Sequence, residues 1–158
     1  MEENPMSTSQ PIAHSGSAQG AQTDIAHASA ALIGRVLLSI IFILSGISKL
    51  AAPAAMIGYI GSVGLPLPQV ALVVAIVVEV GGGLALLSGY RARVAAAVLA
   101  VFSLATALAF HNQLGDQNQF IHFFKNVAMA GGLLQVVAFG AGRFSLDARR
   151  STLAARRR

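Results

Sequence analysis

Residues 69–88 read QVALVVAIVVEVGGGLALLS, a run of twenty residues in which Glu79 is the only charged side chain. About 20 apolar residues are enough for a helix to cross a bilayer. The many Val and Ile residues do not argue for strands, because lipid requires every backbone group to be satisfied within the segment. A membrane barrel would instead alternate over about 10 residues. This stretch therefore predicts a transmembrane helix with one acid near its middle.

Three further runs share this length and apolar character: ALIGRVLLSIIFILSGISKL at 31–50, ARVAAAVLAVFSLATALAFH at 92–111, and FIHFFKNVAMAGGLLQVVAFG at 120–140. Only 11% of the 158 residues are charged, against roughly 25% in a soluble domain. The predicted fold class is therefore all-α, an integral membrane four-helix bundle with antiparallel spans. We expect this membrane domain to occupy residues 31–142.

The segments outside the four runs have their own signatures. Residues 1–30 are rich in Ala, Ser, Gln and His and contain no Lys or Arg, which predicts a disordered N-terminal tail. In the connection 51–68, Pro53 suits the first turn of a short helix. One face of that helix would carry Met56, Tyr59, Ile60 and Val63.

The net charge of +5 lies entirely in an Arg-rich tail at 143–158, since the charges of residues 1–140 cancel. Antiparallel spans place nine Arg residues at the end of the bundle that holds both termini, and only Lys49 and Lys125 at the other end. By the positive-inside rule, both termini are cytoplasmic in a multi-pass protein of the plasma (inner) membrane. We expect the tail to contact anionic lipid headgroups rather than nucleic acid, so the bilayer is the expected partner.

Several chemistries have no support in the sequence. The chain has no cysteine, which excludes disulfides, thiolate catalysis and cysteine-ligated iron–sulfur clusters. No phosphate loop, nucleotide fingerprint or hydrolytic triad is present. His111 and His122 flank the 112–119 loop and could ligate a metal or haem. They lack a third ligand, so we expect no metal site.

Glu79 is the residue that most needs an explanation. It lies ten residues into its run, which places it about 15 Å from the end of the helix and near the bilayer midplane. A charge there costs roughly 2.5–3.5 kcal/mol, so it should face the interior of the bundle. Ala75, Gly82 and Gly83 share its helix face, and such small residues let a neighbouring helix approach closely.

The predicted partner of Glu79 is Lys125. One face of the fourth run carries His122, Lys125, Asn126 and Met129, and Lys125 lies about 8 Å below the outer end of that helix. We interpret Lys49, at the end of the first run, as an interface anchor, with an inward contact to Glu79 as the alternative. The candidate polar cluster, without a catalytic assignment, is therefore Glu79, Lys125, Asn126, Lys49, His111 and His122.

The order of short motifs along the chain resembles the DoxX family of small four-helix membrane proteins. The similar pieces are Gly34-Arg35, Ser45-Gly46-Ile47-Ser48-Lys49-Leu50, Gly64-Leu65-Pro66, Glu79 with Gly81-Gly82-Gly83, Gly89 with Arg93, Phe110-His111, Phe124-Lys125-Asn126, Gly131-Gly132 and Ser145-Leu146-Asp147. The family takes its name from a membrane subunit linked to thiosulfate:quinone oxidoreduction and a terminal quinol oxidase. It has no settled set of catalytic residues to carry over to this chain.

The resemblance implies an accessory membrane subunit of a quinone-linked oxidoreductase or oxidative-stress complex, rather than a self-sufficient enzyme. Quinone contact is the one cofactor role it suggests, and other membrane or redox proteins are the implied partners. Two alternatives remain open. Glu79 at the midplane could serve a small-solute or proton transporter, and the buried pair could belong to a purely structural or assembly factor.

Overall fold

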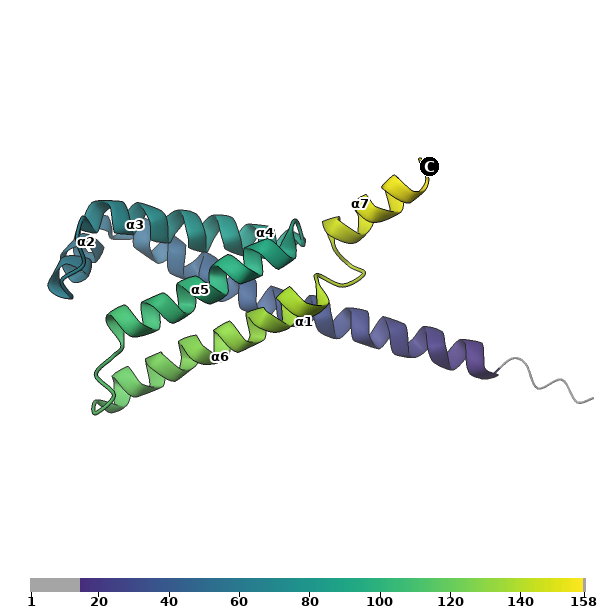
Figure 1. The fold of residues 1–158 in the computed structure, drawn as a ribbon, viewed down its shortest axis with the longest axis horizontal. Helices are drawn as coiled ribbons and strands as arrows, with labels where there is room; N and C mark the ends of the chain where they lie inside the picture. Colours follow the sequence, from purple (N-terminus) through teal and green to yellow (C-terminus); the bar gives the residue numbers. More distant parts are fainter. Residues whose placement is uncertain (1–14, 158) are drawn as a thin grey trace, which may run out of the picture.

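The computed structural model describes residues 15–157, with side chains from residue 22 onward, and contains only helices there. The long helices run roughly along the long axis of the molecule (Figure 1). The elements are α1 (Ser15–Ala51), α2 (Pro53–Ser62), α3 (Pro68–Ile76), the π-helical turn η1 (Val77–Gly81), α4 (Gly82–Ser88), α5 (Ala92–Phe110), α6 (Gln117–Phe139) and α7 (Leu146–Ala155). The all-α prediction is therefore confirmed.

Four helical rods, meaning continuous helical stretches of one or more elements, are long and apolar enough to cross a membrane. They are Gln22–Ala51, Pro68–Ser88, Ala92–Phe110 and Gln117–Phe139. The second rod comprises α3, η1 and α4. The three later spans agree with the predicted ranges to within three residues at each end. Which membrane face each end of the bundle occupies stays a prediction.

The predicted tail at 1–30 is wrong over residues 15–30, which form the first four turns of α1. Residues 1–14 lie outside the described part of the chain. Five alanines, the best helix formers, occur between residues 15 and 30. Extending an existing helix adds one hydrogen bond per residue without a new nucleus. Low hydrophobicity in this segment is therefore compatible with a helix, and its residues 22–27 are exposed.

The short connecting helix is confirmed as α2, with Pro53 in its first turn. Gly64 follows it with a φ of +80°, a left-handed conformation that glycine adopts without steric cost. In Figure 1, α2 lies at the opposite end of the bundle from α7.

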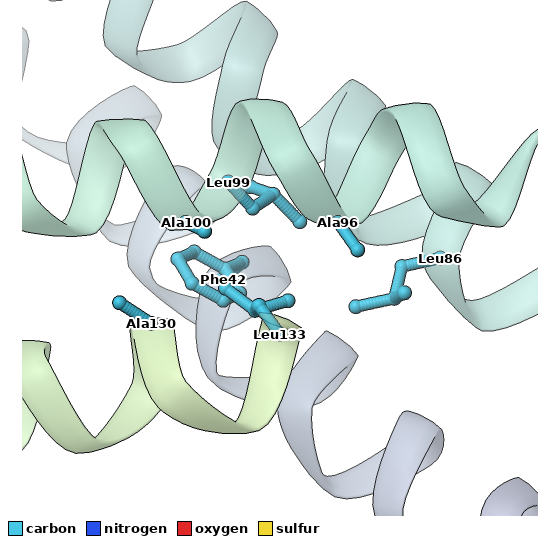
Figure 2. Packing of buried hydrophobic residues seen from close by; sticks show 7 residues of the cluster. All are labelled: Phe42, Leu86, Ala96, Leu99, Ala100, Ala130 and Leu133. Carbon is cyan, nitrogen blue, oxygen red and sulfur yellow. The ribbon is translucent and has the colours of Figure 1, made fainter. Parts of the chain in front are cut away.

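The core lies between α1, α4, α5 and α6, and its side chains meet in one cluster (Figure 2). Its buried members are Phe42, Leu86, Ala96, Leu99, Ala100, Ala130 and Leu133. Alanines on α5 and α6 let those helices approach closely, as small residues do in membrane bundles. By contrast, Val77, Val101 and Phe139 are more than 60% exposed, as expected of side chains that face lipid.

Hydrogen bonds from Arg35 connect α1 to the segment before α7; this group of contacts is called the polar clamp. Arg35 on α1 is only 2% exposed and donates hydrogen bonds to the carbonyl oxygens of Ala141 and, at 2.7 Å, Phe144. From the sequence, Arg35 is one of the charges that orient the chain and part of the Gly34-Arg35 motif. The structure shows that it also ties α1 to the segment after α6.

The Arg-rich tail is not simply a tail, because residues 146–155 form α7. Ser145 begins it by accepting a hydrogen bond from the backbone N–H of Ala148 at 3.1 Å, the usual role of an N-cap serine. Asp147 in turn accepts from the backbone N–H groups of Arg91 and Ala92, at 2.8 and 2.9 Å. Its carboxylate thus caps the first turn of α5 from outside that helix.

Candidate functional site

Glu79 lies in the π-helical turn η1, between α3 and α4. A π turn inserts an extra residue into a helix and is frequent at functional sites. The turn is followed by Gly82 and Gly83, which weaken the regular helix locally. Nothing in the hydrophobic pattern of 69–88 indicated that the helix would widen at Glu79.

Lys49, not Lys125, is the partner of Glu79, so the predicted pairing is wrong. The Lys49 Nζ atom lies 3.0 Å from Oε1 and 2.9 Å from Oε2 of Glu79. Ser45 completes the group, because its hydroxyl donates to Oε1 at 3.1 Å and accepts from Nζ at 2.8 Å. Only the Oε1 contacts have hydrogen-bond geometry, so the buried Oε2 is in ion contact without a directed hydrogen bond.

The close approach of α1 to the second rod explains this choice of partner. A Cβ atom added to Gly46 would lie 2.5 Å from Cγ2 of Val80 and 3.3 Å from Cβ of Glu79. One added to Gly83 would lie 2.7 Å from Cγ1 of Ile43. Two glycines, one on each helix, therefore let the backbones come together, and Lys49 follows Gly46 by three residues on the packed side.

The interpretation of Lys49 as an interface anchor is also wrong. Its side chain is 17% exposed, against 7% for Glu79. Burying both charges is tolerated because each partner compensates the other and Ser45 supplies further hydrogen bonds. The available signal was the four-residue spacing of Ser45 and Lys49, which places both on one helix face.

Lys125 is exposed on α6, and no ion pair involves it within residues 22–157. Asn126, on the same helix, donates from Nδ2 to the carbonyl oxygen of His122 at 3.2 Å. Lys125 and Asn126 nonetheless both line a cavity of about 150 Å³ that also contains Glu79. They are therefore neighbours of the ion pair rather than members of it.

His111 and His122 come together across the α5–α6 connection, as their positions suggested. Their rings stack with centroids 5.0 Å apart and an angle of 22° between the planes. His111 Nδ1 lies 2.9 Å from Oε1 of Gln119. In the described part of the chain, no third His, Cys, Asp or Glu joins them in a group that could hold a metal.

Glu79 also lines a larger cleft of about 520 Å³. Its wall includes Ser45, Lys49, Glu79, Asn126 and His111, together with apolar and aromatic side chains of α2, α3 and α5. Tyr59 and Phe110 stack at this wall with ring centroids 5.5 Å apart. The volume falls within the roughly 300–1,000 Å³ typical of small-molecule pockets.

The sequence did not identify Phe102, Thr106 or Phe110 as parts of this cleft. They lie on one face of α5, whose only charged residue, Arg93, is in its first turn and does not mark that face. Met56, Tyr59 and Ile60 line the cleft, whereas Val63, the fourth residue predicted on the same face of the short helix, follows the last residue of α2 and does not line it. The role of α2 is thus to cover the region beside the ion pair with apolar and aromatic side chains.

Comparison with known proteins gives a consistent result. The DoxX family model matches residues 30–112, more than half of the chain. The inner membrane protein YqjF of Escherichia coli (strain K12) is 36% identical over 116 residues, which cover 73% of this chain and 88% of that protein. The inner membrane protein YphA of the same organism is 33% identical over 123 residues, covering 75% and 88%. No solved structure matches.

The matched region contains Ser45, Lys49, Glu79 and His111, so the buried ion pair lies within the part shared with the family. The relatives are inner membrane proteins, and this chain has four helices able to span a membrane. The protein therefore belongs to the DoxX family and is a multi-pass integral membrane protein of the inner-membrane type.

Proposed function

We propose that this protein is an accessory membrane subunit of a quinone-linked oxidoreductase or oxidative-stress complex, and that its 520 Å³ cleft binds a quinone headgroup. The observation that carries the proposal is the composition of that cleft. A buried ammonium–carboxylate pair lines a space whose other walls are mainly apolar and aromatic. Ligand sites typically combine such walls with a few well-placed polar groups.

The residues present fit a quinone. Its flat ring is apolar and its two carbonyl oxygens are hydrogen-bond acceptors. A lysine ammonium group has three N–H donors, and hydrogen bonds to Ser45 and Glu79 use two of those on Lys49. The third donor is available to a quinone carbonyl, while Phe102 and Phe110 offer aromatic faces to the ring.

Glu79 has a positioning role in this proposal. Its carboxylate holds the ammonium group of Lys49 beside Ser45 at the wall of the cleft. A bound quinone would supply the capacity to carry electrons and protons. Since the chain has no cysteine, we assign any iron–sulfur or thiol centre that exchanges electrons with the quinone to a partner protein.

The edges of the cleft suit a ligand with an apolar tail. Val74, on α3, lines the cleft and is 51% exposed. Within a membrane, such a side chain faces the hydrocarbon region. A quinone could therefore place its headgroup beside Lys49 while its isoprenoid tail extends into lipid.

The packing favours this role over transport. Glu79 lines two cavities, so a small molecule in either cavity could reach its carboxylate. A path toward the opposite end would have to cross Phe42, Leu86, Leu99 and Leu133, none more than 5% exposed. A bundle whose core is filled by buried apolar side chains suits a binding subunit better than a transporter.

The binding test uses the purified protein in nanodiscs of neutral lipid, with a short-tailed ubiquinone analogue as the probe. We expect Lys49→Met to weaken binding at least tenfold. Lys125→Met, which removes an equal charge outside the cleft, should change it less than twofold. Absence of measurable binding by the wild type, or equal losses in both variants, would contradict the proposal.

A second pair of variants leaves the ion pair intact. Ala109→Phe should fill part of the cleft and weaken quinone binding, because Ala109 lines it. Ala128→Phe places the same ring on the exposed side of α6 and serves as the control. The partner half of the proposal is tested by affinity purification of wild type in mild detergent, where failure to recover any oxidoreductase counts against it.

A further inference from the structure

An open groove of about 890 Å³ lies between α7 and Tyr90, away from the cleft described above. Tyr90 belongs to the turn between α4 and α5, so the groove is at the end of the bundle where α7 projects (Figure 1). Its lining residues are Tyr90, Leu146, Arg149, Arg150, Thr152, Leu153 and Arg156.

The groove is formed by one face of α7. Leu146, Arg149, Arg150, Leu153 and Arg156 follow the spacing i, i+3, i+4, i+7 and i+10, which places them on the same side of a helix. Cζ of Arg150 lies 5.0 Å from the centre of the Tyr90 ring. This cation–π contact orients the arginine face of α7 toward the end of the membrane domain.

No carboxylate within residues 22–157 neutralises the positive charge in this groove. Asp147 is the only acid in α7, and its carboxylate is engaged by the backbone N–H groups that begin α5. No carboxylate lines the groove. Within residues 22–157, the one Lys or Arg ion pair is that of Lys49 with Glu79. Three guanidinium groups therefore face an open space with no counter-charge from the described residues.

The groove also lies at the expected level of the membrane surface. Tyr90 follows the second span, which ends at Ser88. Leu146 and Leu153, which alternate with the arginines, are 41% and 58% exposed. Basic and apolar side chains on an exposed helix, with a tyrosine beside them, are typical of the interface between water and lipid.

We infer that this groove is a binding site for the headgroup of an anionic phospholipid. Arg149 and Arg156 bind the phosphate, since guanidinium groups match phosphate oxygens in bidentate geometry. Arg150 stays on Tyr90, and the leucines contact the upper part of the acyl chains. Free phosphate would leave those leucines in water, and a nucleic acid would make no use of them.

A specific lipid-binding site differs from the general attraction between an Arg-rich tail and an anionic membrane. General attraction depends on the number of charges, whereas a site depends on which charges are removed. The chain allows a matched comparison. Arg143 and Arg157 are exposed but do not line the groove, so Arg143→Gln/Arg157→Gln removes the same charge as Arg149→Gln/Arg156→Gln.

The experiment measures binding of phosphatidylglycerol to the purified full chain in neutral detergent, by native mass spectrometry. Phosphatidylcholine is the neutral lipid probe. We expect the wild type to retain phosphatidylglycerol at least tenfold better than phosphatidylcholine. The groove pair should lose this preference at least fivefold and the control pair less than twofold, while both keep the thermal stability of the wild type.

Competition assays distinguish the possible sources of phosphate. Inorganic phosphate and a short RNA oligonucleotide, each at the concentration of the lipid, should displace little phosphatidylglycerol. Equal losses in the two variant pairs would overturn the inference, as would efficient displacement by either competitor. The quinone proposal is untouched by these outcomes, because the groove and the cleft share no residue.

Discussion

Lys49 and Glu79 are thirty residues apart in the chain, yet Nζ of the lysine lies 2.9 Å from Oε2 of the glutamate. The pair joins the end of the first span to the middle of the second. Its formation depends on the close packing of Gly46 against Val80. The same contact that aligns two spans therefore also builds the polar wall of the cleft.

The coupling between these two charges is directly measurable. We expect Lys49→Met and Glu79→Gln each to lower the apparent Tm in mild detergent, because each leaves its partner buried without compensation. The double variant should be less destabilised than the sum of the two, with an interaction energy of about 0.5–3 kcal/mol. Strictly additive effects in the thermal unfolding cycle would mean that the pair does not stabilise the bundle.

Gly46→Ala should destabilise the protein by roughly 1–3 kcal/mol, because the added methyl group overlaps Val80 and forces α1 away from η1. Gly131→Ala is the matched control. Its Cβ would meet no atom within 4 Å, and the helix propensity of Ala should make it neutral or slightly stabilising. Thermal unfolding of both variants in one detergent checks the difference, and equal Tm values would contradict the packing argument.

Arg35→Lys should loosen the clamp at the start of α7. A lysine has no planar fork and cannot reproduce the hydrogen bonds to Ala141 and Phe144. We expect faster proteolytic cleavage within residues 140–146 and a lower Tm. Arg143→Lys makes the same exchange at an exposed position, and we expect the protease to cleave this variant at the wild-type rate.

The orientation of the chain can be tested without removing native thiols, because the protein has no cysteine. Gly115→Cys places a thiol in the exposed α5–α6 connection, and Ser151→Cys places one on the exposed side of α7. With the termini cytoplasmic, a membrane-impermeant maleimide should label residue 115 in intact spheroplasts and residue 151 only after permeabilisation. The reverse pattern would invert the predicted topology.

Much of the fold could be predicted because it depends on local chemistry. A run such as 69–88 must be helical in lipid, where no water satisfies backbone groups. The connecting helix at Pro53 follows equally from proline geometry and apolar spacing. Where this local reasoning failed, at residues 15–30, it had equated low hydrophobicity with disorder, although an adjoining span can extend into an alanine-rich segment.

The apolar run around Glu79 was enough to predict that this acid has a partner, since an isolated charge at the midplane is costly. The same pattern does not specify whether Lys49 or Lys125 pairs with Glu79. Depth along a helix made Lys125 the better candidate, but pairing depends on how closely two helices approach and on which faces meet. Glycines at 46 and 83 bring α1 against the second rod, whereas Lys125 stays on the exposed side of α6. The contact between Lys49 and Glu79 arises from packing between segments distant in the chain, which no local pattern specifies.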